Sequence, residues 1–173
     1  LPQMGRCLDE PEPRVLAMVM SALYCYVENV DDTIMADYSN EFMQKLASKF
    51  TMDSPRLILE EALTSIAAVA GVMEKTFSQY YDEIVPVIKN IIQNCNSDKE
   101  RKLRGKAFEC LSVCGLAVGR AKFAPDAKQC LENMLLIQQN SSDHAHESGY
   151  LNDAIERIVA TLKEDFGQFL PVL

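Results

Sequence analysis

The chain has 173 residues, 48% of them hydrophobic, and a formal net charge of -8 from 17 Lys+Arg and 25 Asp+Glu. Length and apolar content suffice for a sizeable core, while the acidic balance argues against direct nucleic-acid binding and favours a basic partner. Because no signal-peptide pattern and no run of 18 apolar residues is present, the sequence predicts neither secretion nor membrane spanning, and no membrane is expected among its partners.

Helical periodicity predicts four helix pairs in chain order: 11–30 with 34–50, 55–73 with 77–95, 99–118 with 121–139, and 148–163 with a partner that is cut off at 173. Prolines and polar turns separate the pairs, and the polar stretch 140–149 is expected to be a loop. The predicted fold class is therefore all-α, with repeats at about 11–50, 55–95, 99–139 and 148–173. The last repeat is expected to be truncated, because the chain reads as a piece of a longer protein.

Four alanines recur at intervals of 45, 45 and 47 residues, each near the start of a predicted first helix: Ala17, Ala62, Ala107 and Ala154. The next residue is apolar in all four cases: Met18, Leu63, Phe108 and Ile155. A period in the forties built from helix pairs is typical of a HEAT- or armadillo-type solenoid, an α-α superhelix. Such proteins work through an extended surface, so we expect partner binding and no active-site pocket.

Two further patterns support repeats. Asp98 and Arg104 have the Asp-x5-Arg spacing of HEAT units, in which the two charges bridge adjacent repeats. The segment 81–88 is echoed by 166–173, with an aromatic residue five positions before Pro86 and before Pro171. Since proline is tolerated in a first helical turn, both prolines are expected there.

The six cysteines contain no C-x-x-C pair, and the two histidines, His144 and His146, fall in the polar stretch. A zinc site needs about four ligands in closed geometry, so we expect no metal and no cofactor. Cys110 and Cys114 share a helix face with Ala107, which predicts reduced, mostly buried thiols in a cytosolic or nuclear protein.

An enzyme is disfavoured by the same sequence. The adjacent carboxylates Glu60 and Glu61 do not face each other on a helix, and the serines on packing faces have no nearby histidine to act as a base. The basic run 101–106 is expected to pair with neighbouring carboxylates.

The run 103–127, LRGKAFECLSVCGLAVGRAKFAPDA, resembles the importin-β superfamily of nuclear transport receptors. The segments 63–70 and 75–82 and the Phe-Leu-Pro-Val ending resemble it too, so that the similarity covers roughly residues 10–173. It implies a right-handed solenoid whose first helices line the convex face and whose second helices line the concave face.

The resemblance also implies a function. Members bind basic cargo segments and Ran GTPase mainly inside, bind phenylalanine-glycine nucleoporins in apolar grooves outside, and shuttle between cytoplasm and nucleus. Because the family's Ran contacts lie largely in N-terminal repeats, cargo binding is the expected role of this segment. The alternative is a HEAT-repeat scaffold, such as a phosphatase regulatory subunit.

Polar positions on the second helices are the candidate cargo contacts. Glu83, Asn90 and Asn94 lie across one helix from its apolar face, at i, i+7 and i+11. Carboxylates and amides in such a strip accept hydrogen bonds from lysine or arginine of a basic peptide. The further candidates are Asn40 and Glu41 in the first pair and Asp126 and Glu132 in the third.

Overall fold

The computed structural model describes residues 1–95, 97–140 and 148–172, and every regular element in them is helical. The helices are α1 (Pro2–Cys7), α2 (Pro13–Asn29), α3 (Asp32–Lys49), α4 (Arg56–Met73), α5 (Ser78–Asn94), α6 (Arg101–Val118), α7 (Arg120–Asn140) and α8 (Ser148–Leu162). Short 3₁₀ segments occupy Glu74–Phe77, Asp98–Glu100 and Lys163–Val172. The all-α prediction is confirmed, although α1 was not expected from the sequence. The division into four repeats stays a proposal.

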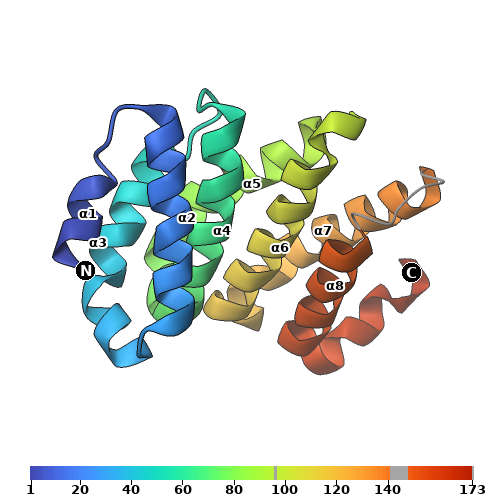
Figure 1. The fold of residues 1–173 in the computed structure, drawn as a ribbon. Coiled ribbons are helices and arrows are strands. Elements are labelled where there is room, and N and C mark those ends of the chain that lie inside the picture. Colours follow the sequence, from blue (N-terminus) through green and yellow to red (C-terminus); the bar gives the residue numbers. More distant parts are fainter. Residues whose placement is uncertain (96, 141–147, 173) are drawn as a thin grey trace.

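The helices form two layers, with α2, α4, α6 and α8 side by side in one row and α3, α5 and α7 behind them (Figure 1). Neighbours in the first row pack closely on one another, and each second helix packs on the first helix of the following pair, α3 on α4, α5 on α6 and α7 on α8. Helices α3 and α5 contact each other far less than first-row neighbours do. The solenoid therefore has a tightly packed row and a more open row.

Small residues explain the tight row. Ala17, Ala62, Ala107 and Ala154 are all buried, as their equivalence predicted. Side chains of this size let helix axes approach to the roughly 8–10 Å of close packing. Equivalent positions also contact each other directly, since the buried Ser65 hydroxyl donates to the Met20 carbonyl at 2.8 Å, exactly one 45-residue period upstream.

One side of α2 is open in the described part of the chain. Its residues Arg14, Met18, Ser21 and Cys25 are all exposed, Met18 by 72%. Their counterparts 45 positions later in α4, which packs on α2, are all buried: Leu59, Leu63, Ile66 and Ala70. The same helix face is thus covered in α4 and uncovered in α2.

A positive φ angle recurs where each of α4, α6 and α8 ends. Glu74 has φ 46°, Gly119 has φ 80° and Lys163 has φ 51°, a conformation that favours glycine. Phe77 and Phe166 follow Glu74 and Lys163 by three residues. The alignment of 81–88 with 166–173 stays a prediction.

Two local expectations need correction. Pro86 lies inside α5 and not in its first turn, so the chain lacks the N–H that would bond to the Asp82 carbonyl. Asp98 pairs with Arg101 at 2.7 Å, while Arg104 donates to the Cys95 carbonyl at 2.9 Å and so ties the end of α5 to α6. Arg104 therefore links two consecutive helices by a hydrogen bond.

Cys110, Cys114 and Cys130 are buried, as expected for the α6 pair, but Cys7 and Cys25 are exposed and Cys95 is intermediate. The prediction of mostly buried thiols is therefore wrong for Cys7 and Cys25, because Cys25 lies on the open side of α2 and Cys7 lies on α1. His144 and His146 lie outside the described residues.

Candidate partner-binding surface

The predicted polar strip of α5 is present. Glu83 and Asn94 are exposed and Asn90 is half-buried, while the opposite face of the helix buries Ile84, Ile88, Ile91 and Ile92. The Asn94 amide donates to the Asn90 side-chain oxygen at 2.6 Å and to its carbonyl at 3.0 Å. The two amides are therefore held together as one polar unit near the end of the helix.

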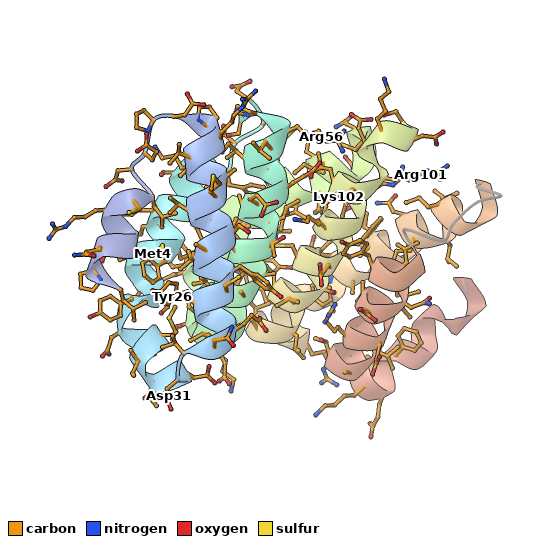
Figure 2. The ribbon with its side chains drawn as sticks, in the orientation of Figure 1. Met4, Tyr26, Asp31, Arg56, Arg101 and Lys102 are labelled. Atoms are coloured by element: carbon orange, nitrogen blue, oxygen red, sulfur yellow. The ribbon has the colours of Figure 1, made fainter. Side chains whose placement is uncertain are left out.

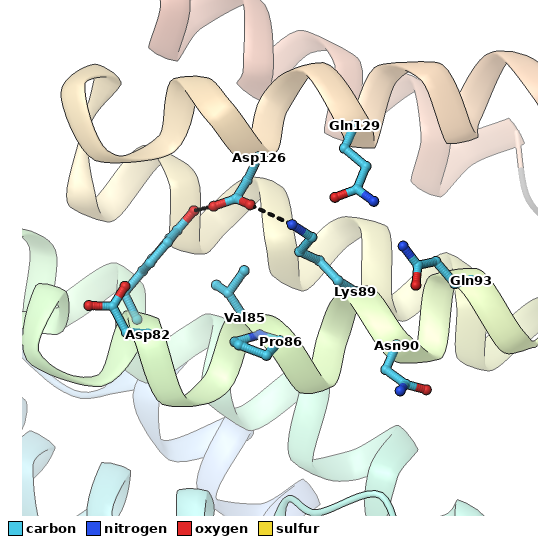
Figure 3. A pocket seen from close by; sticks show the side chains of 9 residues that line it. Asp82, Val85, Pro86, Lys89, Asn90, Gln93, Asp126 and Gln129 are labelled. Atoms are coloured by element: carbon cyan, nitrogen blue, oxygen red, sulfur yellow. Dashed lines mark hydrogen bonds and ion pairs between the residues drawn. The ribbon is translucent and has the colours of Figure 1, made fainter.

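Beside this strip, an open pocket of about 490 Å³ lies between α5 and α7. Figure 3 shows its lining: Val85 and Pro86 form an apolar patch, the amides of Asn90, Gln93 and Gln129 lie toward one end, and Asp82 lies toward the other. Tyr81, Lys89 and Asp126 complete it. The pocket offers both an apolar patch and hydrogen-bond acceptors to a side chain that enters it.

Asp126 is the centre of the pocket's hydrogen bonding. Its Oδ2 accepts from the Tyr81 hydroxyl at 2.7 Å and its Oδ1 accepts from Lys89 Nζ at 2.8 Å. The carboxylate bridges two residues of α5 from its place on α7, as the dashed lines of Figure 3 show. Burial, followed by the hydrogen bond to Asp126 and its charge, raises the pKa of Tyr81, so its phenol remains a proton donor.

A second ion pair crosses the same junction. Lys122 of α7 pairs with Asp82 of α5 at 2.7 Å, and its ammonium lies 5.3 Å from the centre of the Tyr81 ring. Two aspartates and two lysines thus alternate around Tyr81, and their charges cancel. Long polar side chains bridge α5 and α7, in contrast to the small residues of the first row.

The remaining predicted residues lie elsewhere. Asn40 accepts from Gln79 at 3.1 Å and so faces α5. Glu41 lies over α1, because a Cβ added to Gly5 would overlap its carboxylate. Glu132 is exposed and forms a long ion pair with Lys128, at 4.0 Å. The structure therefore brings Asn90 and Asp126 to one pocket and leaves the other candidates outside its lining.

Sequence reasoning missed Tyr81, Asp82 and Lys89 as part of this surface. A helical signal was available, because Tyr81, Val85 and Lys89 recur every four residues and therefore share one face of α5. That this face meets Asp126 depends on how α5 and α7 lie side by side, which the spacing within one helix does not specify.

The basic run of α6 pairs with carboxylates, as predicted. The Lys102 ammonium lies 3.3 Å from the Glu60 carboxylate, which also pairs with the Arg56 guanidinium at 2.7 Å. The Lys106 ammonium lies 3.4 Å from the Glu61 carboxylate. Figure 2 shows Arg56, Lys102 and Arg101 near the same end of α4 and α6. Lys102 and Lys106 therefore connect α6 to α4, whereas Arg56 pairs within α4.

The first-row surface carries a second pocket, of about 560 Å³. Ala67, Ala68 and Gly71 of α4 form its small-residue part, Tyr24 and Tyr150 contribute aromatic rings from α2 and α8, and Glu28, Lys106, Glu109 and Arg157 are its charged members. Burial raises the pKa of Glu109, although the charge of Arg157 opposes this. Residues of all four first-row helices, α2, α4, α6 and α8, line this pocket.

Neither a membrane-spanning helix nor a group of three or more potential metal ligands is found among the described residues. No protein-family profile matches the chain. Two curated proteins are similar to the chain. The chain is 28% identical over 172 residues to importin subunit beta-3 of Saccharomyces cerevisiae, and 25% identical over 148 residues to a probable importin-5 homolog of Dictyostelium discoideum.

Solved structures give the same result. A crystal structure of Kap121p matches 99% of the chain with 28% identity and a TM-score of 0.82. Kap121p bound to RanGTP matches with 29% identity and a TM-score of 0.82, and Kap121p bound to Nup53p with 26% and 0.80. These likenesses support an importin-β family HEAT-repeat segment. The two curated matches cover 98% and 86% of this chain, but only 16% and 14% of the lengths of these relatives.

Proposed function

We propose that this chain is the part of a nuclear import receptor that binds lysine-rich segments of cargo proteins along its second-helix surface. The observation that carries the proposal is the pocket between α5 and α7, where Asp126 already holds a lysine ammonium at 2.8 Å. Cargo is bound and carried in this role, and no chemical step is required of the segment.

Three further observations support it. The net charge of -8 favours a basic partner over the whole chain. Glu83, Asn90 and Asn94 continue the pocket along α5 with further acceptors. The similar Kap121p has been solved in complex with Pho4p, and Cdc14p binds it through its extreme C-terminus. A binding site for extended segments of other proteins fits the open second row.

The other expected partners belong to the same proposal. Kap121p has been solved with Nup53p and with RanGTP, and a receptor of this kind moves between cytoplasm and nucleus through the pore. The first-row pocket, with Ala67, Ala68 and Gly71 between two tyrosines, suits the aromatic side chains of phenylalanine-glycine nucleoporins. Asn40, Glu41 and Glu132 lie outside the lining of the pocket between α5 and α7 and remain candidate contacts for cargo.

The test is the affinity of a short labelled lysine peptide, with the same peptide carrying acetyl-lysine as the neutral control. In the chain, Glu83→Lys with Asn90→Lys should weaken binding several-fold, because each exposed charge contact contributes about 0.2–1 kcal/mol and the new lysines repel the ligand. Binding should also fall as salt rises.

A matched variant controls for net charge. Glu156→Lys with Asn152→Lys makes the same two changes at exposed positions of α8, and it should leave the affinity nearly unchanged. Equal losses in both variants would show non-specific attraction to an acidic chain. If the unaltered chain binds neither peptide, a HEAT scaffold is the better description.

A further inference from the structure

Asp126 is engaged before any ligand arrives. Its carboxylate is only 19% exposed, and each of its oxygens has a partner within the chain, Tyr81 on one and Lys89 on the other. The two partners differ in kind. The Tyr81 hydroxyl reaches Asp126 from a buried ring, whereas Lys89 lies at the pocket, 31% exposed, on a long flexible side chain.

The contact between Lys89 and Asp126 is the contact that a ligand lysine would make. An ammonium meets a carboxylate in an open pocket, next to the apolar patch of Val85 and Pro86 and the amides of Gln93 and Gln129 (Figure 3). A carboxylate accepts several hydrogen bonds, but two ammonium groups on one oxygen repel each other. A lysine from outside therefore competes with Lys89 for this position.

The other lysine of the junction is not equivalent. Lys122 pairs with Asp82, whose side chain is 79% exposed, so that pair is screened by water and salt. Its ammonium also lies over the Tyr81 ring, which favours its present place independently of Asp82. Of the two lysines at this junction, Lys89 is the one that neutralises Asp126, the less exposed of the two pocket carboxylates.

We propose that Lys89 is an internal competitor, which holds Asp126 in the free chain and releases it to a lysine of the bound segment. This inference rests on the proposed function and adds a means of setting its affinity. With Lys89 in place the four charges of the junction sum to zero, so weakly basic segments gain little there. A segment with enough lysines displaces Lys89, whose ammonium then turns toward the amide oxygens of the pocket or into water.

The first experiment compares Lys89→Met with Lys99→Met in binding to the short lysine peptide. Both changes lower the net charge from -8 to -9, but Lys99 is exposed in the 3₁₀ segment before α6 and does not line the pocket. Lys89→Met should bind the peptide at least about threefold more tightly than Lys99→Met does, because it frees Asp126 while keeping an apolar stem. Adding Asp126→Asn to Lys89→Met should remove the gain.

The second experiment needs no variant and so remains decisive if Lys89→Met does not fold. A lysine-acylating reagent is applied to the unaltered chain with and without peptide, and each modified lysine is quantified by mass spectrometry. Labelling of Lys89 should rise when peptide binds, relative to Lys99 in the same sample. Reduced or unchanged labelling of Lys89 would overturn the proposal.

The outcomes distinguish the role of Lys89 from the proposed binding function. If Lys89→Met and Lys99→Met bind equally, or if Lys89→Met binds more weakly, Lys89 is no competitor although the binding function stands. If the unaltered chain and every variant fail to bind the lysine peptide, the proposed function fails, and the role of Lys89 with it.

Discussion

The hydroxyl of Ser65 donates a 2.8 Å hydrogen bond to the carbonyl of Met20, the residue that occupies the same position one repeat earlier. Ser65 is fully buried, so this bond joins α2 to α4 within the packed row.

Replacing Ser65 with alanine should lower the free energy of unfolding by about 1 kcal/mol, the usual net contribution of one buried hydrogen bond. Ser48→Ala is the control, since the exposed Ser48 hydroxyl donates to a carbonyl of its own helix, that of Lys45. The control should change stability by less than about 0.5 kcal/mol. Urea denaturation followed by circular dichroism measures both, and equal effects would contradict the role given to Ser65.

The positive φ of Glu74 predicts a stabilising substitution. A residue other than glycine is strained by about 1–3 kcal/mol in this conformation, and glycine is not. Since glycine loses more chain entropy on folding, Glu74→Gly should raise the free energy of unfolding by roughly 0.5–2 kcal/mol. Lys75→Gly, one residue on, should destabilise. Gly119→Ala should also destabilise, by about 1 kcal/mol or more, because alanine is strained at φ 80°. A lower melting temperature for Glu74→Gly would show that no strain is stored there.

The raised pKa of Glu109 predicts that the stability difference between the unaltered chain and Glu109→Gln depends on pH. Its folded pKa is raised by burial, so the folded chain holds this proton more tightly than the unfolded chain. The resulting contribution is present below the unfolded pKa of about 4.3 and is lost as pH rises through the folded value. Glu109→Gln should therefore match the unaltered chain near pH 4 and become the more stable of the two toward pH 7.

Chemical denaturation at several pH values measures this difference. Exposed Glu156→Gln on α8 should change stability by less than about 0.5 kcal/mol throughout. A Glu109→Gln difference that shrinks with rising pH would reverse the assigned sign.

Thiol reactivity should follow burial. In the native chain, Cys7 and Cys25 should react with a thiol reagent first, whereas Cys110, Cys114 and Cys130 should react only after unfolding. Burial raises the pKa of Cys110 and of Cys130, which further lowers the fraction of reactive thiolate. Mass spectrometry of partly labelled protein gives the order, and early labelling of Cys130 would contradict the packing of α7.

The helices and their repeat were predictable because each depends on local periodicity. The spacing of Ala17, Ala62 and Ala107 identified the packed row, and the predicted helix limits lie close to those of α2 to α8. The turn at Glu74 was not predictable in the same way, since a glutamate carries no sign of a positive φ. Only comparison with Gly119 at the same structural position reveals it.

The binding surface was predictable only in part. Glu83, Asn90 and Asn94 were found because one helix face is encoded in one stretch of sequence. The partnership of Asp126 with Tyr81 and Lys89 joins residues 45 and 37 positions apart on two helices. Its geometry follows from the tertiary packing of α5 beside α7, which no single periodic pattern specifies.

The buried face of α4 that corresponds to the open side of α2 makes the array extendable by internal duplication. A second copy of residues 56–100 placed directly after residue 100 would present Leu59, Leu63 and Ile66 to the same α4 surface that α6 now covers. The inserted α4 would itself offer the original α6 an unchanged neighbour. Longer arrays are thus within reach of gene duplication, with the α4–α6 interface kept at one junction and a new contact between the two copies of α4 at the other.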